Sequence, residues 1–333
     1  MSGDFIWRDA GRTVVFRHNG VTQAPRLLRE HGFAPFELLS TPRALAGAAG
    51  LVAAASAVHE VPPGQVPELA GALLGSATSE YLVALGGGRV IDTAKAIAAV
   101  SGARVAAIPT TMSGAEMTAI HRLPEGADAS GMVRPALVVA DPEAMTGQAE
   151  PALRASSMNA LAHGADSLYT PFSSPVSEMA ALRGAELIAT SLDHDPEGRD
   201  ASSLALGSIL CGYAIDSAMF GLHHVICQTL VRVCGSPHAE TNAAILPRAL
   251  AFLVARVPDR LADLAAAIET DPEDIEARVL RLGGDPAGLE AIGAKRSKLD
   301  AALESMLLRP ELAFVPGPPL TKGDLAKLVD TAW

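Results

Sequence analysis

The sequence predicts a two-domain protein, with an α/β domain over residues 1–150 and an all-helical domain over residues 151–333. Three observations lead to this prediction. A chain of 333 residues is longer than one hydrophobic core usually serves. Its first half alternates short apolar runs with helical periods, which is typical of a parallel sheet covered by helices on both faces. Beyond residue 150 only helical periodicity remains.

Each element is expected from its own local pattern. Short apolar runs predict strands at Thr13–Phe16, Phe36–Leu39, Tyr81–Leu85, Val105–Ile108 and Ala136–Ala140. Helical periods in the first domain cover Val21–His31, 43–56, Gln65–Leu74 and Val90–Val100. In the second domain they cover Pro151–Tyr169, Val176–Asp193, Ser202–Met219, His224–Val233, Asn242–Val254, Asp259–Ile268 and Ile275–Leu282, and a last short helix follows Val315–Pro319.

Composition excludes several classes of function. Hydrophobic residues make up 49% of the chain and charged residues 19%, which favours a large buried core over disorder. The net charge of -11 disfavours binding to nucleic acid or to anionic lipid. No apolar run has the length of a membrane span, and the opening MSGDFIWRDAGR has no signal-peptide core. With only three cysteines as well, we expect a cytoplasmic protein whose partner is a small-molecule substrate.

A glycine-rich turn is the first candidate functional feature. The segment Tyr81–Lys95 reads YLVALGGGRVIDTAK, so that an apolar strand enters three glycines and a helix begins at once. Glycines permit positive φ and let a pyrophosphate approach the backbone, and a helix N-terminus offers free N–H groups to it. The alternative interpretation is a plain tight turn between a strand and a helix.

Histidines form the second candidate feature. Asn159 and His163 are four residues apart and therefore share one face of a predicted helix. His224 and His238 each stand near the start of a later helix. A single histidine is more often a packed or surface residue, but imidazoles that converge on a cleft are suited to metal binding or proton transfer.

The glycine turn resembles a signature of the iron-containing alcohol dehydrogenase superfamily, GGGSxxDxAK. The chain keeps Gly86, Gly87, Gly88, Asp92, Ala94 and Lys95, and has Arg89 in place of the serine. Residues 108–118 read IPTTMSGAEMT, similar to the IPTTYAGSEMT motif of the maleylacetate reductase branch. The resemblance implies a dehydroquinate synthase-like fold, with a Rossmann-like N-terminal domain followed by an all-α domain, and it leads us to expect a homodimer.

The resemblance also implies which residues contact the dinucleotide. Beyond the turn, Asp92 and Lys95, they are Thr110, Thr111, Ser113 and Thr118, although Thr110 and Thr111 can instead cap a strand end. Ser40 ends the second predicted strand, in the segment Ser40–Arg43, without the acidic residue that would bind an adenosine ribose and exclude its phosphate. The choice between NADH and NADPH therefore stays open. Arg43 either favours the phosphorylated cofactor or is a solvated surface charge.

The same resemblance assigns the histidines. Metal-dependent members carry an aspartate, a histidine four residues later, and two histidines fourteen residues apart. His163, His224 and His238 match the three histidines, but Asn159 stands at the aspartate position, as in the reductase branch. Without that carboxylate we expect no tightly bound iron, although zinc on three histidines remains possible. The three histidines and Asn159 then become the catalytic residues around one cleft, acting as donors or acids toward a substrate oxygen.

Several positions depart from the reductase pattern. They are Gln228, which replaces a histidine, Arg232 and Arg248, a short segment at 119–126, and the C-terminal tail. Arg122, Arg232 and Arg248 either face an acidic substrate or lie on the surface. Because the cofactor motifs are kept, we expect hydride chemistry on a different substrate, and the alternative is neutral drift within a true maleylacetate reductase.

The sequence thus predicts an NAD(P)H-dependent reductase of a small unsaturated or oxo carboxylate. Two alternatives stay open. One is a metal-dependent alcohol dehydrogenase of the same fold, and the other is a non-redox biosynthetic homologue that has lost hydride transfer.

Overall fold

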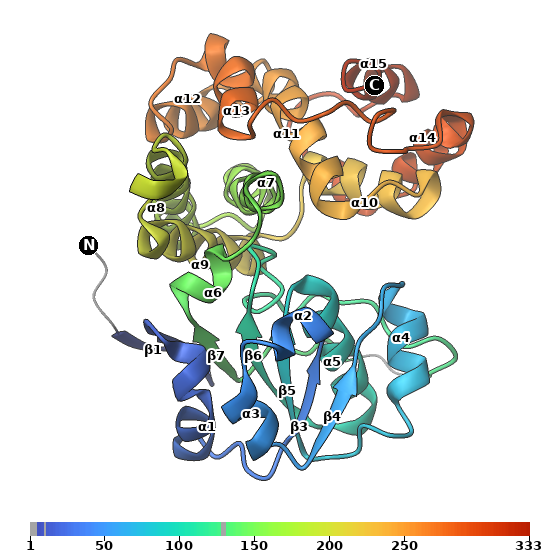
Figure 1. The fold of residues 1–333 in the computed structure, drawn as a ribbon. Coiled ribbons are helices and arrows are strands. Elements are labelled where there is room, and N and C mark those ends of the chain that lie inside the picture. The colour runs from blue at the N-terminus through green and yellow to red at the C-terminus, as the bar shows by residue number, and fades with distance from the viewer. Residues whose placement is uncertain (1–4, 10, 128–130) are drawn as a thin grey trace. The chain divides into compact units, whose positions relative to one another are not determined.

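The structure is a computed structural model that describes residues 5–9, 11–127 and 131–333. The chain divides into two compact units, residues 1–148 and 149–333 (Figure 1). Residues 1–4, at the start of the segment for which we expected no signal peptide, lie outside the described residues.

The first unit is built on a seven-stranded sheet. Its strands are β1 (Phe5–Asp9), β2 (Arg12–Phe16), β3 (Glu37–Ser40), β4 (Ala57–Glu60), β5 (Tyr81–Gly86), β6 (Arg104–Pro109) and β7 (Leu137–Ala140). They lie in the order β1-β2-β7-β6-β5-β3-β4. All neighbours pair in parallel except β1, which runs antiparallel to β2 at one edge. The predicted parallel sheet is confirmed, with one antiparallel strand added.

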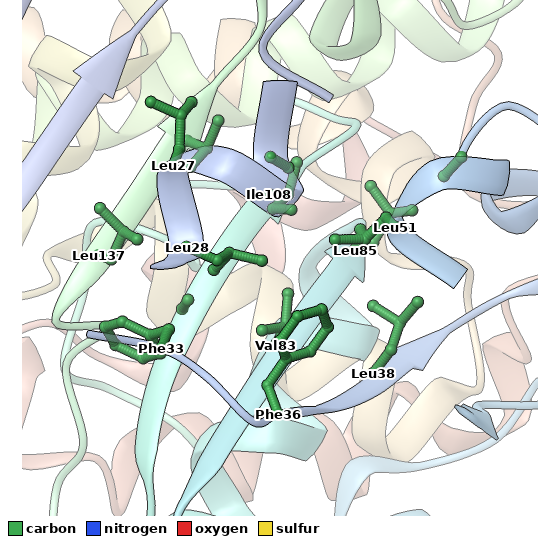
Figure 2. Close-up of a cluster of buried hydrophobic side chains, with 14 of the residues drawn as sticks. Leu27, Leu28, Phe33, Phe36, Leu38, Leu51, Val83, Leu85, Ile108 and Leu137 are labelled. Atoms are coloured by element: carbon green, nitrogen blue, oxygen red, sulfur yellow. The ribbon is translucent and has the colours of Figure 1, made fainter. Parts of the chain in front are cut away.

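Helices cover both faces of this sheet. They are α1 (Gly20–Glu30), α2 (Pro42–Leu45), α3 (Ala49–Ala54), α4 (Val66–Leu73) and α5 (Gly88–Ser101), and a short helix α6 (Pro142–Thr146) follows β7. Successive strand residues point to opposite faces. Val83 and Leu85 pack with residues of α1 and α3, as Figure 2 shows, whereas Leu82 and Ala84 pack with α4 and α5. This two-sided burial explains why the strands read as continuous apolar runs.

Besides β1 and the short helix α6, neither of which was predicted, two details of the first unit differ from the predictions. The single helix expected at 43–56 is two short helices, α2 and α3, separated by a segment that contains Gly47. Strand β4 was not predicted, because Ala57–Glu60 alternates half-buried with exposed residues at a sheet edge and includes His59 and Glu60. Such an edge strand lacks the apolar run on which the strand predictions were based.

The second unit is helical throughout the part of the chain that the structure describes. Its α-helices are α7 (Glu150–Ser167), α8 (Pro175–Leu192), α9 (Ala201–Ala218), α10 (Leu222–Cys234), α11 (His238–Val254), α12 (Pro258–Ala267), α13 (Ile275–Leu282), α14 (Leu299–Leu307) and α15 (Lys322–Asp330). Helix α14 was not predicted, and α11 begins at His238, four residues before the predicted start. Helix α7 contacts α8, α9, α10 and α11, and its residues 155–167 are all buried.

Helices α7, α8 and α9 meet at a close crossing built on small residues. A Cβ atom added to Gly184 of α8 would fall 2.6 Å from Sγ of Cys211 and 2.8 Å from the carbonyl oxygen of Gly207, both in α9. A Cβ on Gly164 of α7 would fall 3.0 Å from the same sulfur. The backbones therefore approach closely only because these positions lack side chains.

No single helix of the described chain is long and apolar enough to cross a membrane. The bent pair formed by α9 and α10 meets the length and composition requirement only when the two helices are taken together.

Candidate active site

The glycine turn lies at the point in the sheet where the strands that follow in the chain are added on the opposite side. From β5 the chain proceeds to β6 and then β7 on one side, whereas β3 and β4 lie on the other side. Gly86 ends β5, and Ser40, which ends β3, is paired with the adjacent Leu85. In open α/β sheets, ligands bind in the crevice at the carboxyl ends of the strands at such a reversal. Sheet topology thus supports the predicted position of the dinucleotide.

The turn packs directly against the threonine- and serine-rich segment after β6. A Cβ added to Gly87 would lie 3.0 Å from Cγ2 and 3.1 Å from Oγ1 of Thr111, and one added to Gly88 would lie 3.0 Å from Cβ of Ser113. The backbone N–H of Thr110 also donates to the carbonyl of Gly86 at 3.0 Å. The structure therefore brings together the predicted residues 86–88, 110, 111 and 113.

The reason for glycine here is space rather than backbone conformation. Gly87 has φ -81° and ψ -173°, so the expected positive φ is wrong at this position. It caps α5 without a side-chain hydrogen bond, and the first N–H groups of a helix have no carbonyl partner within it. A phosphate can therefore bind to these groups. The residues present fit a dinucleotide pyrophosphate.

Lys95 supports the loop next to the turn. Its buried ammonium donates to Oδ1 of Asp92 at 2.8 Å and to the carbonyls of Ala115 and Ile120 at 3.1 and 2.8 Å. An ammonium has three donors, and all three are engaged within the chain. Direct contact of Lys95 with the cofactor stays a prediction, but the bonds it makes fix residues 115–120.

The remaining predicted cofactor residues are held by the backbone. The Ser40 hydroxyl is buried and donates to the carbonyl of Leu85 at 2.7 Å. Thr118 is buried, and its N–H donates to the carbonyl of Gly114 at 3.1 Å. Arg43 is exposed and donates to the carbonyl of Gly147 at 3.2 Å, in agreement with the surface interpretation.

Glu116 is a buried carboxyl group in the same loop that the sequence analysis did not single out. Burial raises its pKa from 4.5 to about 7, against the opposing effects of hydrogen bonding and the positive charge of Lys95. The group therefore titrates near neutral pH.

In the second unit, two of the predicted histidines are in direct contact. The rings of His163, from α7, and His224, from α10, stack with centroids 4.8 Å apart and planes inclined by 11°. Phe220 stacks on His224 as well, at 4.8 Å and 15°. Within the described residues, Nδ1 of His163 and Nε2 of His224 are buried and have no hydrogen-bond partner. Two buried ring nitrogens are thus left for a ligand.

Asn159 and His238 lie close to this pair. Asn159 is buried one turn before His163 on α7. His238 is exposed at the first position of α11, and its charge lowers the pKa of both His163 and His224. The structure therefore brings together all four predicted catalytic residues, although only His163 and His224 stack.

Three polar residues that the sequence analysis missed organise the cluster. Asp166 accepts a hydrogen bond from Nδ1 of His224 at 2.8 Å, and Tyr169 donates its hydroxyl to the same carboxylate. Asn242 accepts from Nε2 of His223 at 2.8 Å and donates to the carbonyl of His238 at 2.6 Å. Asp166 and Tyr169 belong to the segment around His163 that the resemblance covers, and this was the only signal for them.

Burial controls the charge of the histidines. It lowers the pKa of His224 to about 3, with further contributions from the charges of His238 and Arg309. It lowers the pKa of His223 to about 3 and that of His163 well below its ordinary value. All three are neutral at pH 7. Because Asp166 holds the Nδ1 proton, neutral His224 presents a lone pair at Nε2 and accepts a hydrogen bond rather than donating one.

The arrangement does not fit a resident divalent ion. Three neutral imidazoles would offer a divalent ion no anionic ligand. Asn159 supplies no charge. Among the described side chains, no group of three or more His, Cys, Asp or Glu is placed to hold a metal ion.

The departures from the reductase pattern lie in different places. Gln228 follows His224 by one turn of α10 and accepts from Arg309 at 3.1 Å, and Arg309 is also paired with Glu311. The effect of Arg309 on the pKa of His224 places this cation near the cluster, and the sequence analysis missed it. Arg122 and Arg232 are exposed, and Arg248 is half-buried, paired with Glu276 at 3.6 Å.

Comparisons with known proteins show the family of the chain. Its fold combines an α/β unit, which has a glycine turn at the sheet reversal, and a helical unit that carries paired histidines. Residues 13–142 match the family model "Iron-containing alcohol dehydrogenase", and residues 154–314 match "Fe-containing alcohol dehydrogenase family, C-terminal". The chain belongs to the iron-containing alcohol dehydrogenase family and is an oxidoreductase.

Its similar relatives include maleylacetate reductases. That of Rhizobium sp. (strain MTP-10005) is 32% identical, over 92% of each chain, and that of Burkholderia cepacia is 34% identical, over 77% of this chain and 74% of the relative. The crystal structure of maleylacetate reductase from Agrobacterium tumefaciens superposes with a TM-score of 0.85 at 27% identity, covering 100% of this chain and 99% of that one. The fold and the reductase resemblance predicted from the motifs are confirmed.

Proposed function

We propose that the protein is an NAD(P)H-dependent reductase of a small carboxylate that carries an oxo group or an activated double bond. Relatives named maleylacetate reductase, at 32–34% identity, support the substrate class. Gln228, which departs from the reductase pattern, follows His224 by one turn of α10 and accepts a hydrogen bond from Arg309, and this change favours a substrate that differs from maleylacetate.

The first unit holds the cofactor in this proposal. The first turn of α5 and the glycines before it bind the pyrophosphate, and Thr111 and Ser113 line the same turn. Bound NAD(P)H supplies a hydride to a carbon of the substrate. Neither Ser40 nor Arg43 provides the acidic group that would exclude NADPH, so both cofactors are candidates.

The observation that carries the proposal is a pair of buried nitrogens on the stacked rings of His163 and His224, to which the described residues offer no hydrogen-bond partner. Unpaired buried polar atoms are costly, and a ligand that pairs with them would remove this cost. His224 accepts a proton from a substrate hydroxyl in the oxidative direction and returns it to the oxygen in the reductive direction.

A substrate screen tests the proposal. Purified protein is assayed with NADH and with NADPH against maleylacetate, other unsaturated dicarboxylates and oxo acids, and nicotinamide absorbance is recorded. We expect consumption of at least one nicotinamide with a member of this panel. Absence of dinucleotide binding by calorimetry would instead identify a non-redox homologue. Stoichiometric metal that survives dialysis against a chelator would identify a metal-dependent alcohol dehydrogenase.

A cytoplasmic homodimer is part of the same proposal, supported by the family resemblance and the composition. Light scattering of the purified protein tests the oligomeric state, and a monomer mass would contradict it.

A further inference from the structure

His224 is fixed in two ways that have different consequences. Stacking between Phe220 and His163 fixes the plane of its ring. Stacking does not determine on which side of the ring Nδ1 lies, because a rotation of 180° about the Cβ–Cγ bond leaves the ring plane unchanged. A hydrogen bond to one ring nitrogen is needed to fix the orientation.

Asp166 makes that bond. Its Oδ2 lies 2.8 Å from Nδ1 of His224, and the His224 and Asp166 side chains are only 2% and 1% exposed. A carboxylate can only accept, so Nδ1 carries a proton whether the imidazole is neutral or charged. Proton exchange by His224 is thereby confined to Nε2, the buried nitrogen that has no partner among the described residues.

Asp166 is itself held by several donors. Oδ2 also accepts from the backbone N–H groups of Gly221 and His224, at 3.0 and 3.2 Å, at the start of α10. Oδ1 accepts from the hydroxyl of Tyr169, which in turn accepts from the N–H of Leu222 at 2.7 Å. These donors, two of them at the start of a helix, fix the position of the carboxylate.

The network packs closely against Gly221. A Cβ on Gly221 would lie 2.1 Å from Oη of Tyr169 and 2.8 Å from Oδ1 of Asp166. A side chain at position 221 would therefore displace the carboxylate or the phenol, and glycine permits their close approach to the start of α10.

We propose that Asp166, supported by Tyr169, is the positioning residue of the active site. It holds the Nδ1 proton of His224 and so directs Nε2 toward the substrate oxygen. The role of Asp166 in turnover rests on the proposed reductase function, whereas the Nδ1–H tautomer of His224 follows from the hydrogen bond alone. In the oxidative direction the neutral ring takes the hydroxyl proton at Nε2 while hydride leaves the carbon and the C–O double bond forms, and the imidazolium keeps Nδ1–H bonded to Asp166. The reductive step is the reverse: His224 first binds a proton from water at Nε2, and it gives this proton to oxygen as hydride adds to the carbon, which leaves the ring neutral.

The tautomer is measured directly, without a substrate. Protein labelled with ¹⁵N-histidine is examined by long-range ¹H–¹⁵N correlation, which distinguishes Nδ1–H from Nε2–H, and His224→Gln identifies the signal. We expect a single Nδ1–H tautomer in the parent protein. An Nε2–H tautomer would overturn the proposal, and this outcome does not depend on finding a substrate.

A matched pair of variants separates positioning from helix capping. Asp166→Asn keeps an oxygen that can accept from Nδ1 and from the backbone, so the tautomer should be retained. Asp166→Ala removes the acceptor, and His224 should become a mixture of tautomers. With the substrate from the screen, kcat of Asp166→Ala should fall by roughly two to four orders of magnitude. Affinity for the dinucleotide, which binds in the other unit, should stay unchanged.

Two further variants complete the test. Tyr169→Phe should keep the tautomer and lose less activity than Asp166→Ala, because the bond from Asp166 to His224 remains. Asp263→Ala, at an exposed position of α12, is the control for loss of a carboxylate. If Asp166→Ala, assayed below its melting temperature, keeps the single tautomer and the parent kcat, Asp166 is only a helix cap and the proposal is wrong.

Discussion

The glycine turn and the histidine cluster are built by different means. The turn joins two segments that directly follow neighbouring strands, and it depends on backbone groups and on the lack of side chains at Gly87 and Gly88. The cluster joins side chains from α7, α10 and the loop between α9 and α10 through stacking and hydrogen bonds. The first site should therefore be sensitive to added volume, and the second to the loss of a single polar atom.

The largest effect is expected at the cluster. His238→Ala removes an exposed side chain and should lower turnover by roughly two to four orders of magnitude with little change in melting temperature. His224→Ala should lose as much activity and also about 2–4 kcal/mol of stability, because a buried, stacked ring is removed. Activity assays and thermal unfolding measure the two quantities. His194→Ala, at an exposed position, is the control. Near-parent turnover in both variants would exclude the cluster as the reacting site.

The next effect concerns the turn. Gly87→Val should weaken dinucleotide binding by roughly two orders of magnitude, or about 3 kcal/mol, since its Cβ alone would press against Thr111. Calorimetric titration measures the affinity, and circular dichroism checks that the fold persists. Gly50→Val is the matched control, because an added Cβ meets nothing within 4 Å at that exposed position. Equal affinity in both variants would rule out the assigned phosphate site.

The smallest expected effect concerns the stability contribution of Glu116, a buried carboxyl group in the loop beside the glycine turn. The pKa of Glu116 is raised in the folded state, so its carboxyl group stabilises the fold least when ionised. Stability should be complete below pH 4.5 and decline as pH rises through about 7, by at most about 3 kcal/mol. Glu116→Gln should remove this decline, so the variant should exceed the parent in denaturant stability at high pH only. Glu68→Gln, at an exposed site, is the control, and a pH-independent difference for Glu116→Gln would contradict the assignment.

The same contrast explains what the sequence could predict. Buried parallel strands such as β5 and β6 were predicted within a residue or two, because apolar runs and a following glycine turn are local signals. Strand β4 was missed because an exposed edge strand has no such run. Helix α14 was missed because its short apolar pattern follows a stretch of turns. Non-local pairing and packing decide these elements.

For the site, the motifs located the reacting residues but not their supports. Gly87, Thr111 and His224 were assigned from residues adjacent in sequence. The bond from Asp166 to His224 spans 58 residues, and that from Arg309 to Gln228 spans 81. Local sequence patterns do not predict hydrogen-bond partners that are this far apart in the chain. These partners depend on how α7, α10 and the C-terminal segment pack. The tautomer of His224 follows only from that packing.

The crossing of α7, α8 and α9 has a consequence for how the helical unit can be observed. Cys211 is enclosed there by Gly164 and Gly184, and burial raises the pKa of its thiol to about 12. A thiol reagent needs an accessible thiolate, so it reaches this sulfur only when the three helices separate. The rate at which Cys211 is alkylated under native conditions therefore measures how often these helices separate.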